Sequence, residues 1–294
     1  MKKLILILLI FFSVDVFSSP IEIVVPAVAG GPTDAIARTL SKILTDNNIE
    51  NFVSNHGGAE GDIGYNIAME KKDNVIFVAP ISYMVFSHVI QHRENLHAKN
   101  MNIIAPAIVS PMSIITGTKG FKSLKEMIEV AKTKDVPCGL SGGYARIALE
   151  MINQEYNTHF IPIPYKGAGQ ATLDVMGNQI ECIYDAAGVY VAKHNAGQLV
   201  ILGVNSKTPG LTNVPLISTV ISDNKFTNWY GFGIPKNGNV NDNEKVLHIL
   251  NNFSSYNTYL KPLFDMGFIP AKTNKNINQI IIEQTESARQ YYKN

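Results

Sequence analysis

The strongest constraint on the fold is a regular alternation between short β-branched runs and longer segments with apolar residues at helical spacing. Runs of the first kind predict strands, and segments of the second kind predict amphipathic helices. Early in the chain the pattern predicts strands at 21–25, 52–54 and 75–78, and helices at 33–45, 63–70 and 83–91. Strands that alternate with helices favour parallel sheets whose connections cross through a helix.

A second series of strand–helix units follows a longer extended stretch at 101–118. Ser123 and Glu126 then form a capping-box pattern, which predicts the start of a helix. Further units are predicted at 137–140 with 144–156, 160–164 with 170–176, and 180–185 with 190–196. The remaining predictions are extended segments at 199–204, 228–234 and 268–271, and helices at 244–266 and 277–292.

Two α/β units joined by an extended crossing segment, to which the chain later returns, predict a protein with two lobes. The predicted fold class is α/β, with two Rossmann-like domains joined by a two-strand hinge at 107–116 and 229–235. Domain 1 is then discontinuous and comprises residues 19–116 plus 229–294, whereas domain 2 comprises residues 117–228. We expect the ligand cleft between the two domains.

The N-terminus predicts export. Lys2 and Lys3 precede an unbroken apolar run over residues 4–12, and compact residues precede a cleavage point after Ser18. This order of features is typical of a secretory signal peptide, here residues 1–18. The apolar run is shorter than the roughly 20 residues that a membrane span requires. We therefore expect the mature chain to begin at Ser19 and to reside in the periplasm.

Charge and cysteine content exclude several kinds of partner. The sequence has 25 basic and 24 acidic residues, and removal of residues 1–18 takes away two lysines and one aspartate, which leaves no net charge. A neutral chain offers no electrostatic surface for nucleic acid or for an anionic membrane. Cys138 and Cys182 permit one disulfide, but their spacing does not show it, and we interpret them as small buried apolar residues. They give no support for structural zinc.

Three loops between a strand and a helix carry the candidate chemistry. The first contains Ala29, Gly30, Gly31 and Asp34, with Pro32 near the first helical position. Glycines allow a ligand to approach the backbone closely, and the free N–H groups of a helix start attract an anion. The alternative is a tight turn that binds nothing, because glycine is common at such turns.

The second loop, residues 139–143, formally matches the G-x-S-x-G nucleophile elbow of hydrolases. A hydrolase would use Ser141 as nucleophile, Asp185 as acid and either His194 or His248 as base. Asp185 and His194 are close in the sequence, however, and His248 falls inside a predicted helix. We therefore favour a binding role, in which the Ser141 hydroxyl and the backbone N–H groups after it hold a carboxylate oxygen.

The third loop contains Tyr165, Lys166 and Gly167. Lys166 can pair with an anion, and Tyr165 can stack on a ligand or donate a hydrogen bond. The plainer alternative is a solvated lysine on a surface loop. Asp185, at the end of a predicted strand, can accept a hydrogen bond from a ligand hydroxyl or amine, or can cap the next helix.

The histidines carry no recognised metal motif. His88 and His92 lie one helical turn apart, and His97 follows. Such spacing can bind a metal ion, but the glutamate of the zincin motif is absent between the two, so we predict an exposed helix face. Glu60, in a glycine-rich loop, is likewise predicted to be solvated. The sequence therefore predicts neither a metal nor a cofactor.

Several motifs follow one another along nearly the whole predicted mature chain. They are the strand, loop and helix at 24–38, Asn-His-Gly-Gly-Ala-Glu-Gly-Asp-Ile-Gly at 55–64, Pro-Tyr-Lys-Gly at 164–167, the segment 177–185, and Asn-Val-Pro at 213–215. Together they resemble the substrate-binding proteins of tripartite tricarboxylate transporters, the Bug family. The resemblance implies a type II periplasmic-binding-protein fold that closes by hinge motion on a small carboxylate. It also implies delivery to a large and a small membrane transporter subunit.

The resemblance adds the loop after the third strand to the expected site. It implies that the first loop holds a ligand carboxylate through backbone groups and bridging water, and that hydroxyl and amide donors come from the other loops. The residues that we expect to bind ligand are Ala29, Gly30, Gly31, Ser82, Tyr83, Ser141, Gly142, Gly143, Tyr165, Lys166, Gly167 and Asp185.

Four positions depart from the family's pattern. Ala27 stands where an aromatic residue is usual, Glu60 replaces a glycine, and Tyr144 and Arg146 stand where a small hydroxyl residue and a histidine are common. The expected fold tolerates these changes, but the identity of the carboxylate does not follow from the sequence. We expect a monomeric, non-enzymatic solute-binding protein. The alternatives are an exported serine hydrolase that uses Ser141, and a protein of the same fold that presents its ligand to a sensor.

Overall fold

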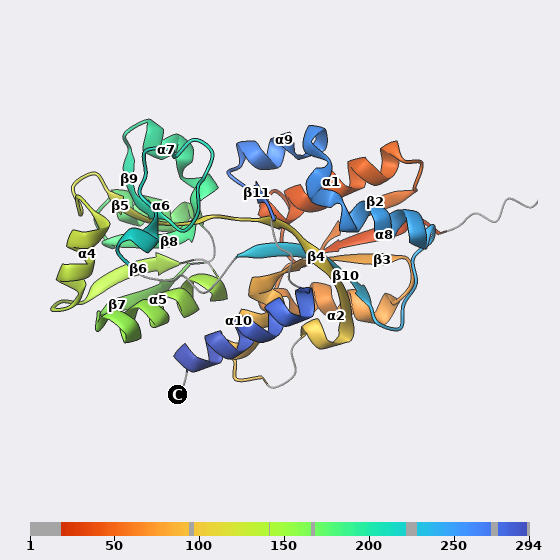
Figure 1. The fold of residues 1–294 in the computed structure, drawn as a ribbon, viewed down its shortest axis with the longest axis horizontal. Helices are drawn as coiled ribbons and strands as arrows, with labels where there is room; N and C mark the ends of the chain where they lie inside the picture. Colours follow the sequence, from red (N-terminus) through yellow and green to blue (C-terminus); the bar gives the residue numbers. More distant parts are fainter. Residues whose placement is uncertain are drawn as a thin grey trace, which may run out of the picture.

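The computed structural model describes residues 19–93, 97–140, 142–165, 168–221, 228–271 and 276–292. They form two lobes, each built on one sheet with helices packed around it (Figure 1). The predicted alternation of strands and helices is confirmed in both lobes.

The first sheet has six strands in the order β11-β4-β10-β3-β1-β2. They are β1 (Ile21–Val25), β2 (Asn51–Asn55), β3 (Val75–Pro80), β4 (Met101–Val109), β10 (Trp229–Pro235) and β11 (Ile269–Pro270). The neighbours β2, β1 and β3 are parallel, whereas β10 runs antiparallel to both β3 and β4. Every residue of β1 and β3 is buried, as expected for parallel strands that helices cover on both faces.

The second sheet has five strands in the order β7-β6-β8-β5-β9. They are β5 (Met112–Gly117), β6 (Val136–Leu140), β7 (Phe160–Pro164), β8 (Cys182–Ala186) and β9 (Leu199–Val204). The neighbours β7, β6 and β8 are parallel, and β5 runs antiparallel to β8. In each sheet, the strand that arrives from the other lobe, β10 in the first and β5 in the second, runs antiparallel to both of its neighbours.

The helices fall into two sets. Those around the first sheet are α1 (Pro32–Asp46), α2 (Asp62–Lys71), α3 (Ser87–Ile90), α8 (Asn243–Asn251) and α9 (Asn257–Asp265), with the π-helix η2 (Ser82–Phe86) and the 3₁₀ turns η1 (Ala59–Gly61), η3 (His97–Asn100) and η6 (Phe253–Ser255). Those around the second sheet are α4 (Leu124–Ala131), α5 (Gly143–Tyr156), α6 (Ala168–Met176) and α7 (Val191–Asn195), with η4 (Ala187–Val189) and η5 (Ile217–Thr219). The last helix, α10 (Ile277–Tyr291), contacts both lobes, through β4 and η2 on one side and α5 on the other (Figure 1).

The crossing segments lie between the sheets, at positions that the sequence located only in part. The predicted hinge at 107–116 includes most of β5, but β5 belongs to the second sheet, so the first crossing is at Ser110 and Pro111. The predicted hinge at 229–235 coincides with β10, which lies wholly in the first sheet. The Ser110 N–H donates to the backbone oxygen of Asn228 at 2.8 Å, which places the two crossings side by side. The division into two domains stays a prediction.

The prediction of one continuous helix at 244–266 is wrong, because this segment forms two helices. α8 ends at Asn251, η6 follows, and α9 begins at Asn257. The side chain of Asn252 donates to the backbone oxygen of His248 at 2.8 Å. Asparagine and serine side chains compete with the helical backbone for hydrogen bonds, so the run from Asn251 to Ser255 favours a break.

Local chemistry fixes several ends of these elements. Ser123 accepts a hydrogen bond from the Glu126 N–H at 3.2 Å, which confirms the predicted cap at the start of α4. Trp229, 1% exposed, donates its indole N–H to Gln284 at 3.0 Å and so ties β10 to α10.

Among the described residues, no helix is both long and apolar enough to cross a membrane. Residues 1–18 lie outside the described ranges, and the signal peptide stays a prediction.

The interpretation of the two cysteines as unpaired is wrong. Cys138 and Cys182 form a disulfide, with their Cα atoms 4.5 Å apart. They face each other in register on the parallel neighbours β6 and β8. The sequence could not show this, because 44 residues separate the two cysteines and only the order of strands in the sheet brings them together.

Candidate functional site

The expected binding residues lie at the carboxyl ends of the parallel strands. The loops after β1, β2 and β3 leave one edge of the first sheet, and the loops after β6, β7 and β8 leave one edge of the second. In open α/β sheets, ligands bind in the crevice outside these strand ends. The topology therefore places the candidate site where the two edges meet.

The loop after β1 is shaped by an aspartate. Gly30 has a φ of 86°, and its N–H donates to Asp34 Oδ2 at 2.9 Å. Arg38 Nε donates to the same oxygen at 2.9 Å. Burial raises the pKa of Asp34, but the hydrogen bonds from Arg38 and Gly30 outweigh that effect and lower it, so the residue is ionised at neutral pH. Asp34 therefore links the turn at Gly30 to Arg38 in the second turn of α1.

Ala29, Gly30 and Gly31 stand at the solvent side of this turn. Ala29 and Gly30 are exposed, and Gly31 is half-buried as the N-cap of α1. The first N–H groups of a helix have no partner within the helix, and α1 starts here with Pro32, which lacks an N–H. The expectation that this helix start holds a ligand carboxylate stays a prediction, and the Gly30 N–H is already bonded to Asp34.

Ser82 and Tyr83 open the π-helix η2 directly after β3, and both are half-buried. The Tyr83 ring packs on Gly61, where an added Cβ would lie 2.7 Å from the ring. Burial raises the pKa of Tyr83, and the Glu60 carboxylate raises it further. Tyr83 therefore stays protonated at neutral pH and can donate a hydrogen bond. Glu60 itself is exposed, as predicted.

Gly142 and Gly143 bring the second lobe against this π-helix. Gly142 is exposed with a φ of 95°, and Gly143 is buried as the first residue of α5. A Cβ on Gly143 would lie 3.3 Å from both Phe86 Cβ and the Ser87 nitrogen. The start of α5 in one lobe thus meets η2 and α3 of the other. Ser141, the third predicted donor of this loop, lies outside the described residues.

Two residues of the second lobe have partners within their own lobe. The Tyr165 hydroxyl donates to Asp174 Oδ2 at 2.7 Å, and burial and this carboxylate raise the pKa of Tyr165 to about 12. This bond joins the loop after β7 to α6. The sequence predicted a contact of Tyr165 with ligand and did not predict this bond. Buried Asp185 accepts from the Ala186 N–H at 2.7 Å and from the Tyr190 hydroxyl at 3.2 Å. Lys166 and Gly167 lie outside the described residues.

Tyr230 is a further residue near the candidate site that the sequence did not single out. It lies on β10 and is 9% exposed. Burial raises its pKa most, and electrostatic coupling to Tyr83 and Asp185 raises it further. Electrostatic coupling of this kind requires the three side chains to be near one another. Asp185 of the second lobe therefore lies near Tyr230 of the first, a proximity that depends on the crossing of β10 into the first sheet.

The residues of the alternative hydrolase are engaged in other contacts. Asp185 is held by Ala186 and Tyr190, as described above. His194 Nδ1 accepts from the Ile201 N–H at 3.2 Å, which joins α7 to β9. His248 is on α8 of the first lobe, where its backbone oxygen accepts from Asn252. These contacts join helices and strands within each lobe, and the predicted nucleophile, Ser141, lies outside the described residues.

The histidine prediction is wrong for His88. It is 2% exposed, and its ring lies 4.1 Å from that of His97, so the face of α3 that carries it is buried. Burial, followed by the influence of His88, lowers the pKa of His97 to about 4, and burial lowers that of His88. His92 is exposed, as predicted. The spacing of His88 and His92 could not reveal that His88 instead meets a residue on η3.

Arg146, whose role the sequence left open, faces the C-terminal helix. Its guanidinium lies over the Tyr292 ring, 5.4 Å from the centroid. It also lowers the pKa of Glu150, although burial raises that pKa by more. Arg146 therefore contacts the end of α10 rather than the strand-end loops.

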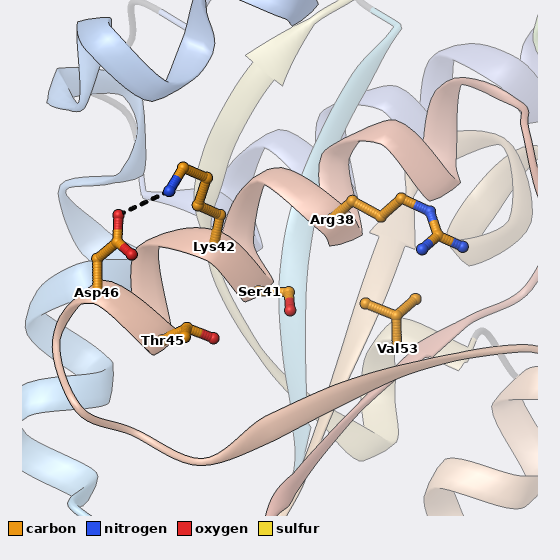
Figure 2. Close-up of a pocket in the computed structure, with 6 residues that line it drawn as sticks. All are labelled: Arg38, Ser41, Lys42, Thr45, Asp46 and Val53. Carbon is orange, nitrogen blue, oxygen red and sulfur yellow. Dashed lines mark hydrogen bonds and ion pairs between the residues drawn. The ribbon is translucent and has the colours of Figure 1, made fainter.

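A groove on the outer side of α1 is a further concave feature. Its lining residues come from α1 and β2: Arg38, Ser41, Lys42, Thr45, Asp46 and Val53 (Figure 2). Lys42 points toward Asp46, to which it is bonded at 3.0 Å, and the Arg38 side chain is 60% exposed. None of the expected ligand-binding residues lines this groove, which is an open face of a surface helix.

Comparison with known proteins assigns the family. The model of the tripartite tricarboxylate transporter family receptor matches residues 35–293. The chain belongs to this family. Membership confirms the predicted resemblance, and because the family is one of receptors, it also confirms the predicted non-enzymatic class.

Curated relatives agree with the assignment. A UPF0065 protein of Bordetella bronchiseptica is 29% identical over 213 residues, which cover 69% of this chain and 64% of the relative. BugT of Bordetella pertussis is 25% identical over 211 residues, which cover 68% of this chain and 64% of BugT. The chain therefore matches just under two thirds of the length of these relatives.

Solved structures confirm the predicted two-lobed periplasmic-binding-protein fold. A structure described as a periplasmic transporter has a TM-score of 0.74 at 24% identity and covers 92% of this chain and 95% of its own. MatC of Rhodopseudomonas palustris, with bound malate, has a TM-score of 0.73 at 15% identity, with coverages of 92% and 98%. Another R. palustris protein, with adipate, has a TM-score of 0.72 at 16% identity, with coverages of 92% and 94%.

Proposed function

We propose that this chain is an exported periplasmic receptor that captures a small carboxylate between its lobes. It then delivers the ligand to the large and small membrane subunits of a tripartite tricarboxylate-type transporter. Membership of the receptor family supports this role. The neighbours of similar fold that hold malate and adipate support a carboxylate as the ligand.

The observation that carries the proposal is the meeting of strand-end loops from both lobes. Gly143 at the start of α5 packs against Phe86 and Ser87, directly after the segment that holds Ser82 and Tyr83. A ligand held by the helix start at Gly31 and by the helix start at Gly143 would contact both lobes at once. Such bridging favours the closed arrangement, because the ligand gains contacts only when the lobes approach.

The chemistry of the site suits reversible capture. The described candidates on the first lobe are backbone N–H groups and the hydroxyls of Ser82 and Tyr83, which are neutral donors. Neutral donors bind an anion without the desolvation cost that a buried cation would add. Buried Asp185, whose carboxylate oxygens face the Ala186 N–H and the Tyr190 hydroxyl, is the candidate acceptor in the second lobe.

Thermal unfolding of residues 19–294 against mono-, di- and tricarboxylates and amino acids tests the proposal. A ligand present at about 100 times its dissociation constant adds roughly 2.7 kcal/mol to the folded state. For a chain of this size, that should raise the midpoint by about 2 to 8 °C. A selective rise with one class of carboxylate is the expected result. No rise with any carboxylate, or equal rises with all compounds, would contradict the proposal.

A further inference from the structure

Two histidines and one aspartate form a compact cluster in the first lobe, on elements that follow the strand-end loops. Asp62 begins α2, His88 lies on α3, and His97 begins η3. One ligand atom from each residue lies within 4.8 Å of the other two. Imidazole nitrogens with a carboxylate oxygen are a donor set that Zn²⁺ and similar borderline divalent cations favour.

His88 is the second and independent observation. Its side chain is buried, at 2% exposure, and neither of its ring nitrogens has a hydrogen-bond partner within the described part of the chain. His97 Nδ1 is likewise buried without a partner there. A buried polar group without a partner is unfavourable, and native proteins rarely keep one without a reason. A cation bound between the two rings would supply a partner for one ring nitrogen of His88.

Neighbouring side chains hold Asp62 and His97 in place. Arg93 Nη1 donates to Asp62 Oδ2 at 2.7 Å, which leaves Asp62 Oδ1 directed at His97 Nε2, 3.3 Å away. The His97 ring stacks on Tyr65 with centroids 3.5 Å apart and an interplanar angle of 4°. The Tyr65 hydroxyl in turn accepts from Asn100 at 3.1 Å. Outer partners of this kind orient metal ligands in established sites.

We propose that Asp62, His88 and His97 bind one divalent cation of the zinc class, with water in the fourth position. Ligands at bond lengths of about 2.0 to 2.1 Å around a tetrahedral ion lie about 3.4 Å apart. The Asp62–His97 pair already has this separation, at 3.3 Å, whereas the His88 ligand atom lies within 4.8 Å of the other two and would have to move closer on binding. The positive charge of Arg93 beside the carboxylate weakens cation binding, so the site is of moderate affinity. The proposal does not depend on the carboxylate ligand.

Calorimetric titration of the tag-free, chelator-treated chain with Zn²⁺ tests the site. We expect one equivalent to bind. Co²⁺, used as a spectroscopic probe, should give the visible absorption of a four-coordinate ion with nitrogen and oxygen ligands, and Zn²⁺ should displace it. Asp62→Asn and His97→Gln should each weaken binding by about 100-fold or more, since even outer partners of metal ligands change affinity by 10- to 100-fold.

His92→Asn is the matched control. His92 is exposed on the adjacent turn and has a φ of 52°, a conformation that asparagine tolerates. The His92→Asn variant should therefore bind Zn²⁺ with the affinity of the wild type. Circular dichroism of each variant shows whether it folds. The proposal is overturned if the wild-type chain binds no Zn²⁺ and gives no four-coordinate Co²⁺ spectrum. It is also overturned if folded Asp62→Asn and His97→Gln retain wild-type affinity, or if His92→Asn loses as much affinity as they do.

Discussion

Glycines near the strand ends of this molecule fall into two groups that differ in their surroundings. Gly30 and Gly142 have positive φ values, of 86° and 95°, and an added Cβ would meet nothing within 4 Å. Gly143 and Gly188 have ordinary backbone conformations but almost no space. A Cβ on Gly188, which lies in η4 of the second lobe, would lie 1.6 Å from the backbone oxygen of Met266 in the first.

This difference in surrounding space indicates two roles for the glycines, one in the proposed binding of ligand and one in the packing of the lobes against each other. At Gly30 and Gly142, glycine is required by the backbone conformation, and the space beside it is open for a ligand. At Gly143 and Gly188 the other lobe lies where a side chain would be, with little room at Gly143 and none at Gly188. The first group therefore shapes the proposed binding surface, and the second sets how closely the lobes approach.

The largest expected effect is that of Gly188→Ala. The new methyl group overlaps a backbone carbonyl, which cannot rotate away as a side chain could. We expect a loss of about 3 kcal/mol in the free energy of unfolding, at the upper end of overpacking effects. Urea denaturation measures it. Gly169→Ala is the control, because Gly169 lies in α6 with open space around it, and alanine there should gain up to about 1 kcal/mol. Equal stability of the two variants would break the comparison.

Gly142→Ala should have an intermediate effect on stability. A residue with a side chain at a φ of 95° costs about 1 to 2 kcal/mol, although no neighbour opposes the methyl group. Carboxylate affinity should fall as well, because the backbone before α5 shifts. Denaturation and ligand titration of the same sample measure both quantities. A variant as stable as the wild type would show that the strain argument does not apply here.

Gly143→Ala should change stability by less than about 1 kcal/mol. Alanine favours the first turn of α5, but its Cβ would be 3.0 Å from the Ile90 side chain and 3.3 Å from the Ser87 nitrogen, so the two effects oppose each other. The methyl group should push the lobes slightly apart and weaken carboxylate binding. Unchanged affinity would indicate that the contact between α5 and η2 does not set the closed arrangement.

The sequence predicted the elements better than their assembly. Strand–helix alternation located nearly every element, because apolar periodicity reports which face of a segment is buried. It could not assign β5 to the second sheet, pair Cys138 with Cys182, or bury His88 against His97. These features depend on which strands and helices become neighbours in space. The break at Asn252 was missed because apolar spacing continues on both sides of it.

For the candidate site too, the sequence predicted the local turns better than the contacts between distant segments. The glycine turn at Gly30 and the start of α5 at Gly142 are located where their strand-end positions predict. Tyr165 was expected to face the ligand but bonds to Asp174, in the second turn of the following helix, α6. Tyr230 was missed, because its proximity to Asp185 arises only where the chain crosses between the lobes.

The measurement that tests the central claim most directly is calorimetric titration of the best-stabilising carboxylate into wild type and Gly31→Ala. Gly31 has an extended conformation that alanine adopts, and its Cβ would have no neighbour closer than 3.9 Å, so stability should change by less than about 0.5 kcal/mol. If the turn before α1 holds the carboxylate through its backbone, the methyl group blocks that approach. The account then predicts affinity weakened about 10-fold or more in a fully folded variant. An unchanged dissociation constant would contradict it.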